Sequence, residues 1–327
     1  MSALLLKRAS IRPALTVAAL IGILVLLALP YLLSPYHLGL AVQMLIFALF
    51  AMSLDLLIGY GGMPSLGHAA YFGVAGYATG LLALRLSLSV WLAIPAGLLL
   101  AALTAALFGL LALRTRGSYF LMITLALGQV VWGIAFGWRS LTGGDDGLPD
   151  VPRPNFGLHL DLPWSLTNDT SFYYFVLFFV VVGTFLLVRI VTSPFGYALR
   201  GIRESETRML ALGYNVWRYR FVAFVLAATF AGLAGCLYVY FNRFVSPDYL
   251  HVGRSAEILL MVILGGSGTL IGPAIGAVLI VFLENVVSAY TERWLLLLGL
   301  VYVVVALFAP TGLMGLVRER RLRRTEP

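Results

Sequence analysis

Few side chains in this sequence could do chemistry, and most of them lie in apolar surroundings. Ser65 and His68 stand three positions apart, and a serine near a histidine is the minimum needed for an activated nucleophile. No third group or oxyanion-stabilising site accompanies the pair. We therefore read Ser65 and His68 either as polar groups on a translocation path or as part of a tight helix–helix contact, rather than as an enzyme centre.

The sequence contains no motif for nucleotide hydrolysis or metal binding. A phosphate-binding loop needs GxxxxGK[ST], and the only lysine is Lys7. The single cysteine, Cys236, excludes an internal disulfide. The four histidines are scattered without HExxH or Cys/His spacing. We expect no metal site and no cofactor in this chain, and no enzymatic activity of its own.

The elements that position these residues are membrane helices. Of the 327 residues, 61% are hydrophobic and only 11% are charged, with a mean hydropathy of +0.96. A soluble chain carries about 25% charged residues. Continuous apolar runs of about 20 residues match the length of a bilayer-spanning helix, whereas barrel strands would be short and alternating. The sequence predicts an all-α integral membrane bundle in contact with lipid.

Turn chemistry divides the chain into ten predicted spans. They are residues 14–34, 38–58, 65–84, 91–113, 118–138, 172–191, 219–242, 255–266, 271–289 and 294–311. The first is longer than the apolar core of a signal peptide, about 7–15 residues, so we expect it to be retained. If 255–289 were one helix, nine spans would remain and the basic tail would face outward, so we divide this region at Gly265–Gly268. The piece 255–266 is short enough to be a half-helix or re-entrant segment; we expect ten spans, with eight as the alternative.

Basic residues set the orientation. Arginines and lysines collect before the first span, at Arg114 and Arg116, around residues 193–218 and in the tail 312–327, and cytoplasmic loops favour such residues. Residues 139–171 carry five aspartates and then face outward. Both termini lie in the cytoplasm, so the number of crossings is even. The formal charge of +8 is thereby explained without a nucleic-acid partner. We treat 1–327 as one transmembrane domain.

Two hydrophobic segments are interrupted by glycine, one in each half of the chain. They cover residues 59–80 and 257–273. Broken helices expose backbone groups along transport pathways, although small residues also allow ordinary close helix packing.

Residues 193–218 form the longest polar loop that we place in the cytoplasm. From Tyr197 to Leu212 the pattern predicts one amphipathic helix, which Gly213 ends. Its charges are mixed, which argues against simple binding to anionic lipid. A peripheral protein is the better partner for this helix, with the lipid interface as the alternative.

Three acidic residues fall within predicted spans, namely Asp55, Glu257 and Glu284. Each must face protein or water. Because Asp55 and Glu257 lie near predicted span ends, we expect their side chains to reach the membrane interface.

Four motifs, in order along the chain, carry a family resemblance. Residues 65–69 read SLGHA, 142–148 read TGGDDGL, 198–204 read ALRGIRE with ALGY at 211–214, and 264–273 read LGGSGTLIGP. They resemble the motifs of branched-chain amino acid permease subunits of bacterial ABC importers over roughly residues 40–310. The long external loop and extended N-terminus are similar to the M-type subunit of the two-permease pair.

This resemblance implies partners and residue roles. The partners would be a second, homologous permease, two cytoplasmic ATPase subunits that use the ATP, and a periplasmic or extracellular substrate-binding protein, all at the bacterial inner membrane. The implied roles are a substrate pathway (Ser65, His68, Tyr71, Gly73, Gly265, Gly266, Ser267, Gly268), ATPase docking at the coupling loop 193–218 (Arg200, Arg203, Glu204, Glu206, Arg208, Gly213) and contact with the binding protein (Asp145, Asp146, Arg153).

Several functions remain open at this point. Members of the family also import urea, short amides and other amino acids. An ion-coupled secondary transporter would need no docking helix at 197–212, and uptake that survives loss of the ATPase would favour it. A passive channel would conduct without ATP or a binding protein.

Overall fold

The computed structural model describes residues 24–154 and 168–291, with further positions at 22, 166, 293, 296, 299–300, 303 and 312–315. Within these residues the regular structure is helical, and a single isolated bridge joins Leu148 to Val245. Residues 14–21 and 23 of the predicted first span lie outside the described residues, as do most of the last span 294–311 and of the basic tail.

Seven described helices are long and apolar enough to cross a membrane. The first combines α2 (Pro35–Asp55) with the π-helical turn η1 (Leu56–Tyr60). The others are α3 (His68–Leu86), α4 (Val90–Ala112), α5 (Ser118–Gly137), α7 (Asp169–Val191), α10 (Val216–Asn242) and α12 (Ile271–Tyr290). Each coincides with a predicted span, and the bounds agree within three residues. The helical membrane fold is confirmed to this extent.

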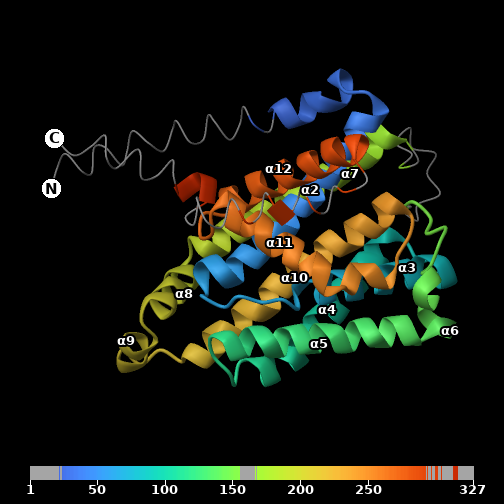
Figure 1. Ribbon diagram of the computed structural model, residues 1–327. Coiled ribbons are helices and arrows are strands. Elements are labelled where there is room, and N and C mark those ends of the chain that lie inside the picture. The colour runs from blue at the N-terminus through green and yellow to red at the C-terminus, as the bar shows by residue number, and fades with distance from the viewer. Residues whose placement is uncertain are drawn as a thin grey trace, which may run out of the picture.

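The remaining elements are short. They are α6 (Arg139–Thr142), η2 (Gly144–Asp146), α8 (Pro194–Glu204), α9 (Glu206–Ala211), η3 (Pro247–Leu250) and α11 (Val252–Gly265). α11 corresponds to the predicted span 255–266 and has 14 residues, fewer than the roughly 20 that cross a bilayer. In Figure 1, α8 and α9 lie at one end of the bundle and α6 lies at the other.

The core centres on α10, which packs on α2, α3 and α4. Small residues bring these helices close. A Cβ on Gly235 would overlap the backbone carbonyl of Phe72 in α3, so the two helices touch at their backbones there. Packing of this kind drives helix association in lipid, where the hydrophobic effect between helices is absent.

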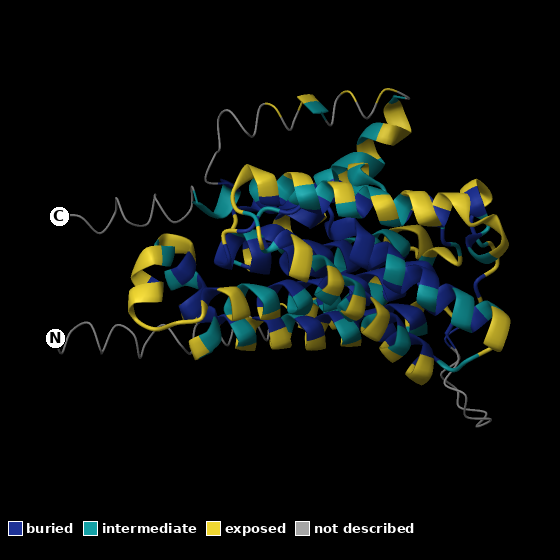
Figure 2. Cartoon of the chain, turned by 90° about the horizontal axis from the view of Figure 1, so that it is seen from below, coloured by how far each residue is buried: buried dark blue, intermediate teal, exposed yellow. Residues whose placement is uncertain are grey.

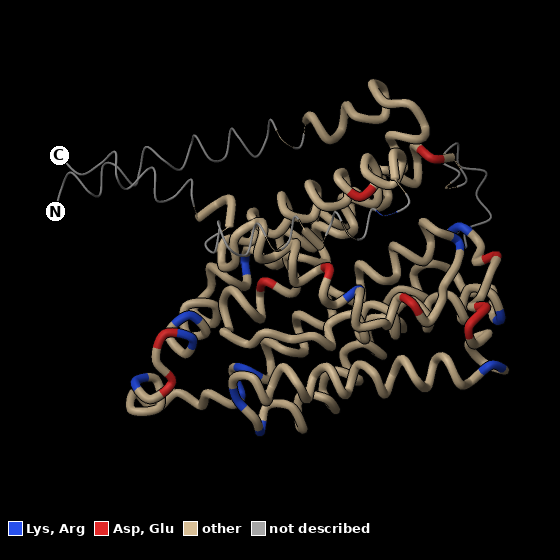
Figure 3. The backbone as a smooth tube through the Cα atoms, in the orientation of Figure 1, with Lys and Arg blue, Asp and Glu red and all other residues tan. Residues whose placement is uncertain are grey.

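Apolar side chains also cover the outside of the bundle. α4, α5, α7 and α12 each expose large hydrophobic residues, including Leu99, Met122, Phe178 and Phe282. Figure 2 shows the buried residues inside and the exposed ones along the outer faces of the helices. The described arginines and acidic residues lie mainly toward the two ends, with a few inside (Figure 3). This distribution suits a bundle surrounded by hydrocarbon.

The chain re-enters the bundle after α10 as an extended segment followed by α11. A Cβ on Gly80 would contact Val245, a Cβ on Gly73 would overlap Leu250, and the Ala69 amide donates to Ser255 Oγ at 2.9 Å. Residues 245 to 255 thus run antiparallel to α3. The crossing is a broken one, part extended and part helix, which explains why α11 is short.

Candidate functional site

The loop 193–218 folds as two helices where the sequence suggested one. Ser193 caps α8, with Pro194 at its first turn, and Ser205 caps α9 by accepting from the Arg208 amide at 3.3 Å. Ser205 is extended, at φ −158° and ψ 99°, which interrupts the helix. The prediction of a continuous helix over 197–212 was wrong, because a serine hydroxyl that caps a new first turn competes with continued helix.

One face of the coupling loop packs on itself and on the bundle. Ala198, Ile202, Met209 and Val216 form a small buried cluster, and Leu199 belongs to the main core. The amphipathic pattern therefore anchors the two helices to the membrane bundle and fixes where their other faces point.

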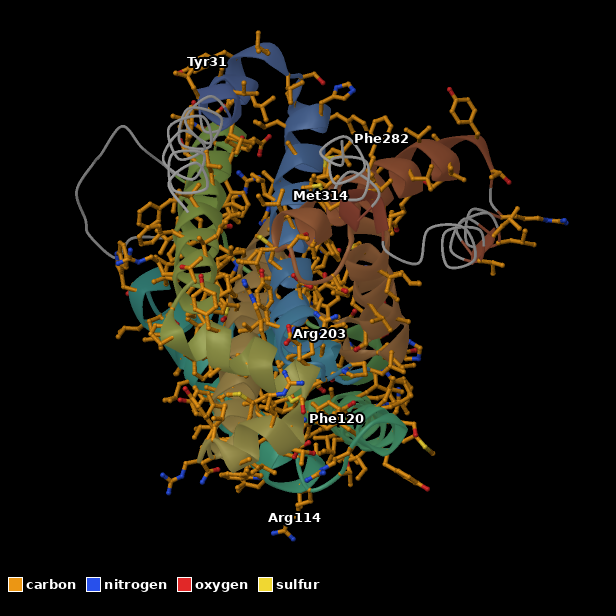
Figure 4. The ribbon with its side chains drawn as sticks, turned by 90° about the vertical axis from the view of Figure 1, so that its left-hand side faces the viewer. Tyr31, Arg114, Phe120, Arg203, Phe282 and Met314 are labelled. Atoms are coloured by element: carbon orange, nitrogen blue, oxygen red, sulfur yellow. The ribbon has the colours of Figure 1, made fainter. Side chains whose placement is uncertain are left out.

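Three of the six residues predicted to dock an ATPase, namely Arg200, Arg203 and Glu206, contact other parts of this protein. The Arg200 guanidinium lies over the Tyr60 ring at 4.7 Å. Glu206 pairs with Arg116 at 2.9 Å and with Arg220 at 3.1 Å, which ties the loop to the turn between α4 and α5. Glu204, Arg208 and Gly213 are exposed. Figure 4 looks onto this end, where Arg203 and Arg114 lie.

Arg203 extends from α8 to the end of the first long helix. Its guanidinium Nη1 donates to the backbone carbonyl of Gly59 in η1. A Cβ on Gly268, in the glycine turn between α11 and α12, would lie 3.3 Å from the same guanidinium nitrogen. The coupling loop thus contacts both glycine-interrupted segments at one point.

Asp55 completes this contact from α2. Its Oδ1 accepts from the Gly268 amide at 2.6 Å and its Oδ2 from the Leu270 amide at 3.0 Å. The Asp55 side chain is fully buried, and hydrogen bonds to charged groups contribute about 1.5–3 kcal/mol each. We call Asp55, Gly59, Arg203, Gly268 and Leu270 the Asp55 junction.

The expectation that Asp55 reaches the membrane interface was wrong. The carboxylate is held inside by two backbone N–H groups from a turn more than 200 residues later. Gly266 and Gly268 adopt φ values of +102° and +84°, and the turn they make presents those N–H groups to Asp55. Glu257 also lies inside, paired with Arg254 at 2.7 Å.

Close packing at the Asp55 junction requires glycine at position 59. A Cβ there would overlap Asp55 Oδ1 and the Gly268 backbone. η1 is a π-helical turn, and such wide turns are often found at functional sites.

The predicted pathway residues near α3 are buried. Ser65, His68 and Tyr71 are each at most 1% exposed. The Ser53 hydroxyl donates to the Phe50 carbonyl at 2.6 Å, so it accepts from His68 Nε2 at 2.8 Å. His68 Nδ1 is buried and has no hydrogen-bond partner among the described residues.

This geometry separates His68 from Ser65. The histidine bonds to Ser53 of α2, while Ser65 Oγ accepts from the Gly67 amide at 3.3 Å. A Cβ on Gly73 would overlap Leu250, so the same part of α3 packs on the re-entering segment. Ser53 is a partner that sequence reasoning missed.

The second predicted pathway group lies at the Asp55 junction. Gly265 and Gly266 are buried and Ser267 is exposed in the turn between α11 and α12. A Cβ on Gly265 would overlap the Gly272 carbonyl, so the two helices cross at their backbones. This turn lies beside Arg203 of α8, whereas Gly73 packs on Leu250.

The predicted contacts with a binding protein lie at the opposite end. Asp145 and Asp146 are exposed in η2. Arg153 pairs with Asp169 at 2.6 Å, so it links the segment after η2 to the start of α7. Among the described residues, no group of three histidine, cysteine or acidic side chains could hold a metal ion.

Comparisons with known proteins agree on one family. The family model for the branched-chain amino acid transport system permease component matches residues 36–307. The permease protein LivM of the high-affinity branched-chain amino acid transport system of Escherichia coli is 30% identical over 92% of this chain and 75% of its own length. LivM of Salmonella typhimurium is 29% identical over 91% and 74%. The permease protein LivH of Salmonella typhimurium is 26% identical over 82% and 91%. No solved structure matches the chain significantly.

The fold and the site define a polytopic membrane protein with a broken crossing and a helical loop fastened to it. The chain belongs to the family of branched-chain amino acid transport permease components. Its relatives are transport subunits and not enzymes, which agrees with the resemblance seen in the motifs.

Proposed function

We propose that this chain is one transmembrane subunit of an ATP-driven importer for branched-chain amino acids. The observation that carries the proposal is the Asp55 junction. There, Arg203 of the loop helix α8 bonds to Gly59 at the end of the first long helix and lies beside Gly268 in the α11–α12 turn. A separate ATPase that moved α8 would therefore act directly on the segments that could form the pathway.

The proposed transport cycle depends on contacts between the ATPase and the coupling loop that differ from one nucleotide state to the next. An ATPase partner shifts a two-state equilibrium only if its nucleotide states contact the coupling loop differently. The Asp55 junction joins that loop to α2 and to the α11–α12 turn, so a displacement of α8 pulls on Gly59 and, through it, on the Gly268 turn. The partners in this proposal are a homologous permease, two ATPases and a soluble binding protein that meets Asp145 and Asp146.

We further propose ten crossings, with both termini in the cytoplasm of a bacterial cell and the chain in its inner membrane. The described helices support an alternating path. The basic Arg116 turn and the coupling loop share one end through the Arg116–Glu206 pair, while η2 lies at the other end (Figure 1). Residues 14–34 and 294–311 supply the first and last crossings in this proposal, which bring the total to ten.

Reconstitution tests this function. The permease pair and its ATPases are placed in proteoliposomes with the soluble binding protein, and uptake of labelled leucine is followed with and without ATP. We expect uptake to require ATP and the binding protein. Uptake driven by a proton or sodium gradient without ATP would contradict the proposal.

A further inference from the structure

A cavity at the outer end of the bundle has walls suited to a free amino acid. It is an open cavity of about 190 Å³ between the end of α5, η2 and the residues around η3. A cavity of about 150 Å³ is large enough to hold benzene. This cavity therefore has room for one small amino acid.

One wall of the cavity is aromatic. Trp132 and Phe136 lie one turn apart on α5, with their rings stacked at a centroid distance of 5.2 Å. His251 extends this wall. Its ring centroid lies 5.8 Å from that of Trp132, in an edge-on arrangement. Such a wall favours an aliphatic side chain, because apolar surface on both partners leaves water.

Two other residues of the cavity wall carry carboxylates, which complement a positively charged ligand group. Asp145 and Asp248 both line the cavity, and carboxylates attract an ammonium group. Arg254 lies 3.9 Å from Asp248 and also pairs with Glu257, so the position of the Asp248 carboxylate is linked to α11.

His251 also lines the cavity and supplies a hydrogen-bond donor. Its Nδ1 accepts from the Gly253 amide at 3.1 Å. In the neutral ring the proton is therefore on Nε2, where it serves as a hydrogen-bond donor. A carboxylate in the cavity would accept from that N–H.

We propose that this cavity receives the zwitterion of an aliphatic amino acid before it enters the bundle. The ammonium group lies toward Asp145 and Asp248, the carboxylate toward His251 Nε2, and the side chain against Trp132 and Phe136. This inference rests on the proposed import function and adds to it a receiving site on the permease itself. The site stands where the broken crossing begins, so a ligand leaving it would next meet the 245–255 segment.

The test measures protection of a cysteine in the cavity wall. Ser246 lines the cavity, and the native Cys236 is buried. The S246C variant is assembled with its partner subunits in lipid nanodiscs without the binding protein, and its labelling by a membrane-impermeant maleimide is followed against leucine concentration. The matched control is S140C, an exposed serine of α6 that does not line the cavity.

We expect leucine to slow labelling of S246C about tenfold once its concentration is roughly ten times the dissociation constant, and to leave S140C unchanged. Two leucine analogues probe the charges without altering the protein: 3-methylbutylamine lacks the carboxylate and 4-methylpentanoate lacks the amine. Both should protect poorly. D248N should raise the half-protecting leucine concentration about fivefold, since a solvent-exposed charge contact is modest.

Two results would overturn the inference while import stands. One is a preparation that takes up leucine in proteoliposomes but shows no leucine protection of S246C. The other is equal protection by leucine and by both analogues, because the charged groups would then make no contribution. A preparation without ATP-dependent uptake would count against the proposed function itself.

Discussion

The substitution D55N probes the Asp55 junction with the smallest change in shape. The asparagine retains one acceptor oxygen and puts an NH2 group where the second oxygen accepted, so an amide donor now faces either the Gly268 or the Leu270 N–H. It also removes the negative charge near Arg203.

The magnitude follows from these contacts. A buried donor left without its acceptor costs about 1–3 kcal/mol. A coupling free energy of that size corresponds to roughly a 5- to 150-fold change in a two-state equilibrium. Because the side chain is fully buried, solvent does not reduce the effect. We expect the contact between the α11–α12 turn and α2 to weaken by a factor in that range.

The assay compares uptake with ATP hydrolysis in the same proteoliposomes. D55N should lower leucine uptake per ATP hydrolysed by about fivefold or more, because α8 then moves without carrying the Gly268 turn with it. The matched control is D150N, the same chemical change at an exposed residue that follows η2. Asp150 has a φ of +59°, which asparagine also tolerates.

D55N protein that assembles and shows wild-type uptake per ATP would refute the reasoning. A loss of uptake in D150N to the same extent would do so as well, because the effect would then not depend on the junction.

Three further predictions concern the same end of the molecule. G59A should lower the stability of the detergent-solubilised complex by about 1–3 kcal/mol, since its Cβ would overlap Asp55 and the Gly268 backbone. The control G133A should not, because no atom lies within 4 Å of a Cβ at that position. Equal melting curves for the two variants would contradict this prediction. E206Q and R116Q should show a coupling energy of about 0.5–1 kcal/mol in a double-mutant cycle on stability, because Glu206 pairs with Arg116; additive effects would argue against that pair. L210D should reduce co-purification of the ATPase subunits without changing melting, because Leu210 is 52% exposed on α9; unchanged co-purification would remove this surface from the docking site.

The membrane helices could be predicted because each is defined by its own sequence. A run such as 219–242 is long, apolar and bounded by polar turns, and a bilayer imposes the length. The glycine break at residues 265–268 was also visible, since glycines so close together favour a turn over a continuous helix. The matching helices in the structure follow these local rules.

The site was less accessible to sequence reasoning because its partners are distant. Asp55 bonds to amides more than 200 residues later, and His68 bonds to Ser53 on another helix. Nothing in the residues around Asp55 distinguishes burial at a junction from a position at the membrane interface. Ser205 is an intermediate case, because its role as a helix cap is local but its effect in splitting the 197–212 helix depends on which of two hydrogen-bonding patterns is more stable.

The side of the membrane on which the coupling loop lies tests the account most directly. Single cysteines at Thr207 in α9 and at Ser140 in α6 are both exposed and lie at opposite ends of the bundle. Labelling with an impermeant maleimide is compared in intact spheroplasts and inverted membrane vesicles. We predict that T207C reacts only in inverted vesicles and S140C only in spheroplasts; labelling of T207C in intact spheroplasts would contradict a coupling loop driven by cytoplasmic ATPases.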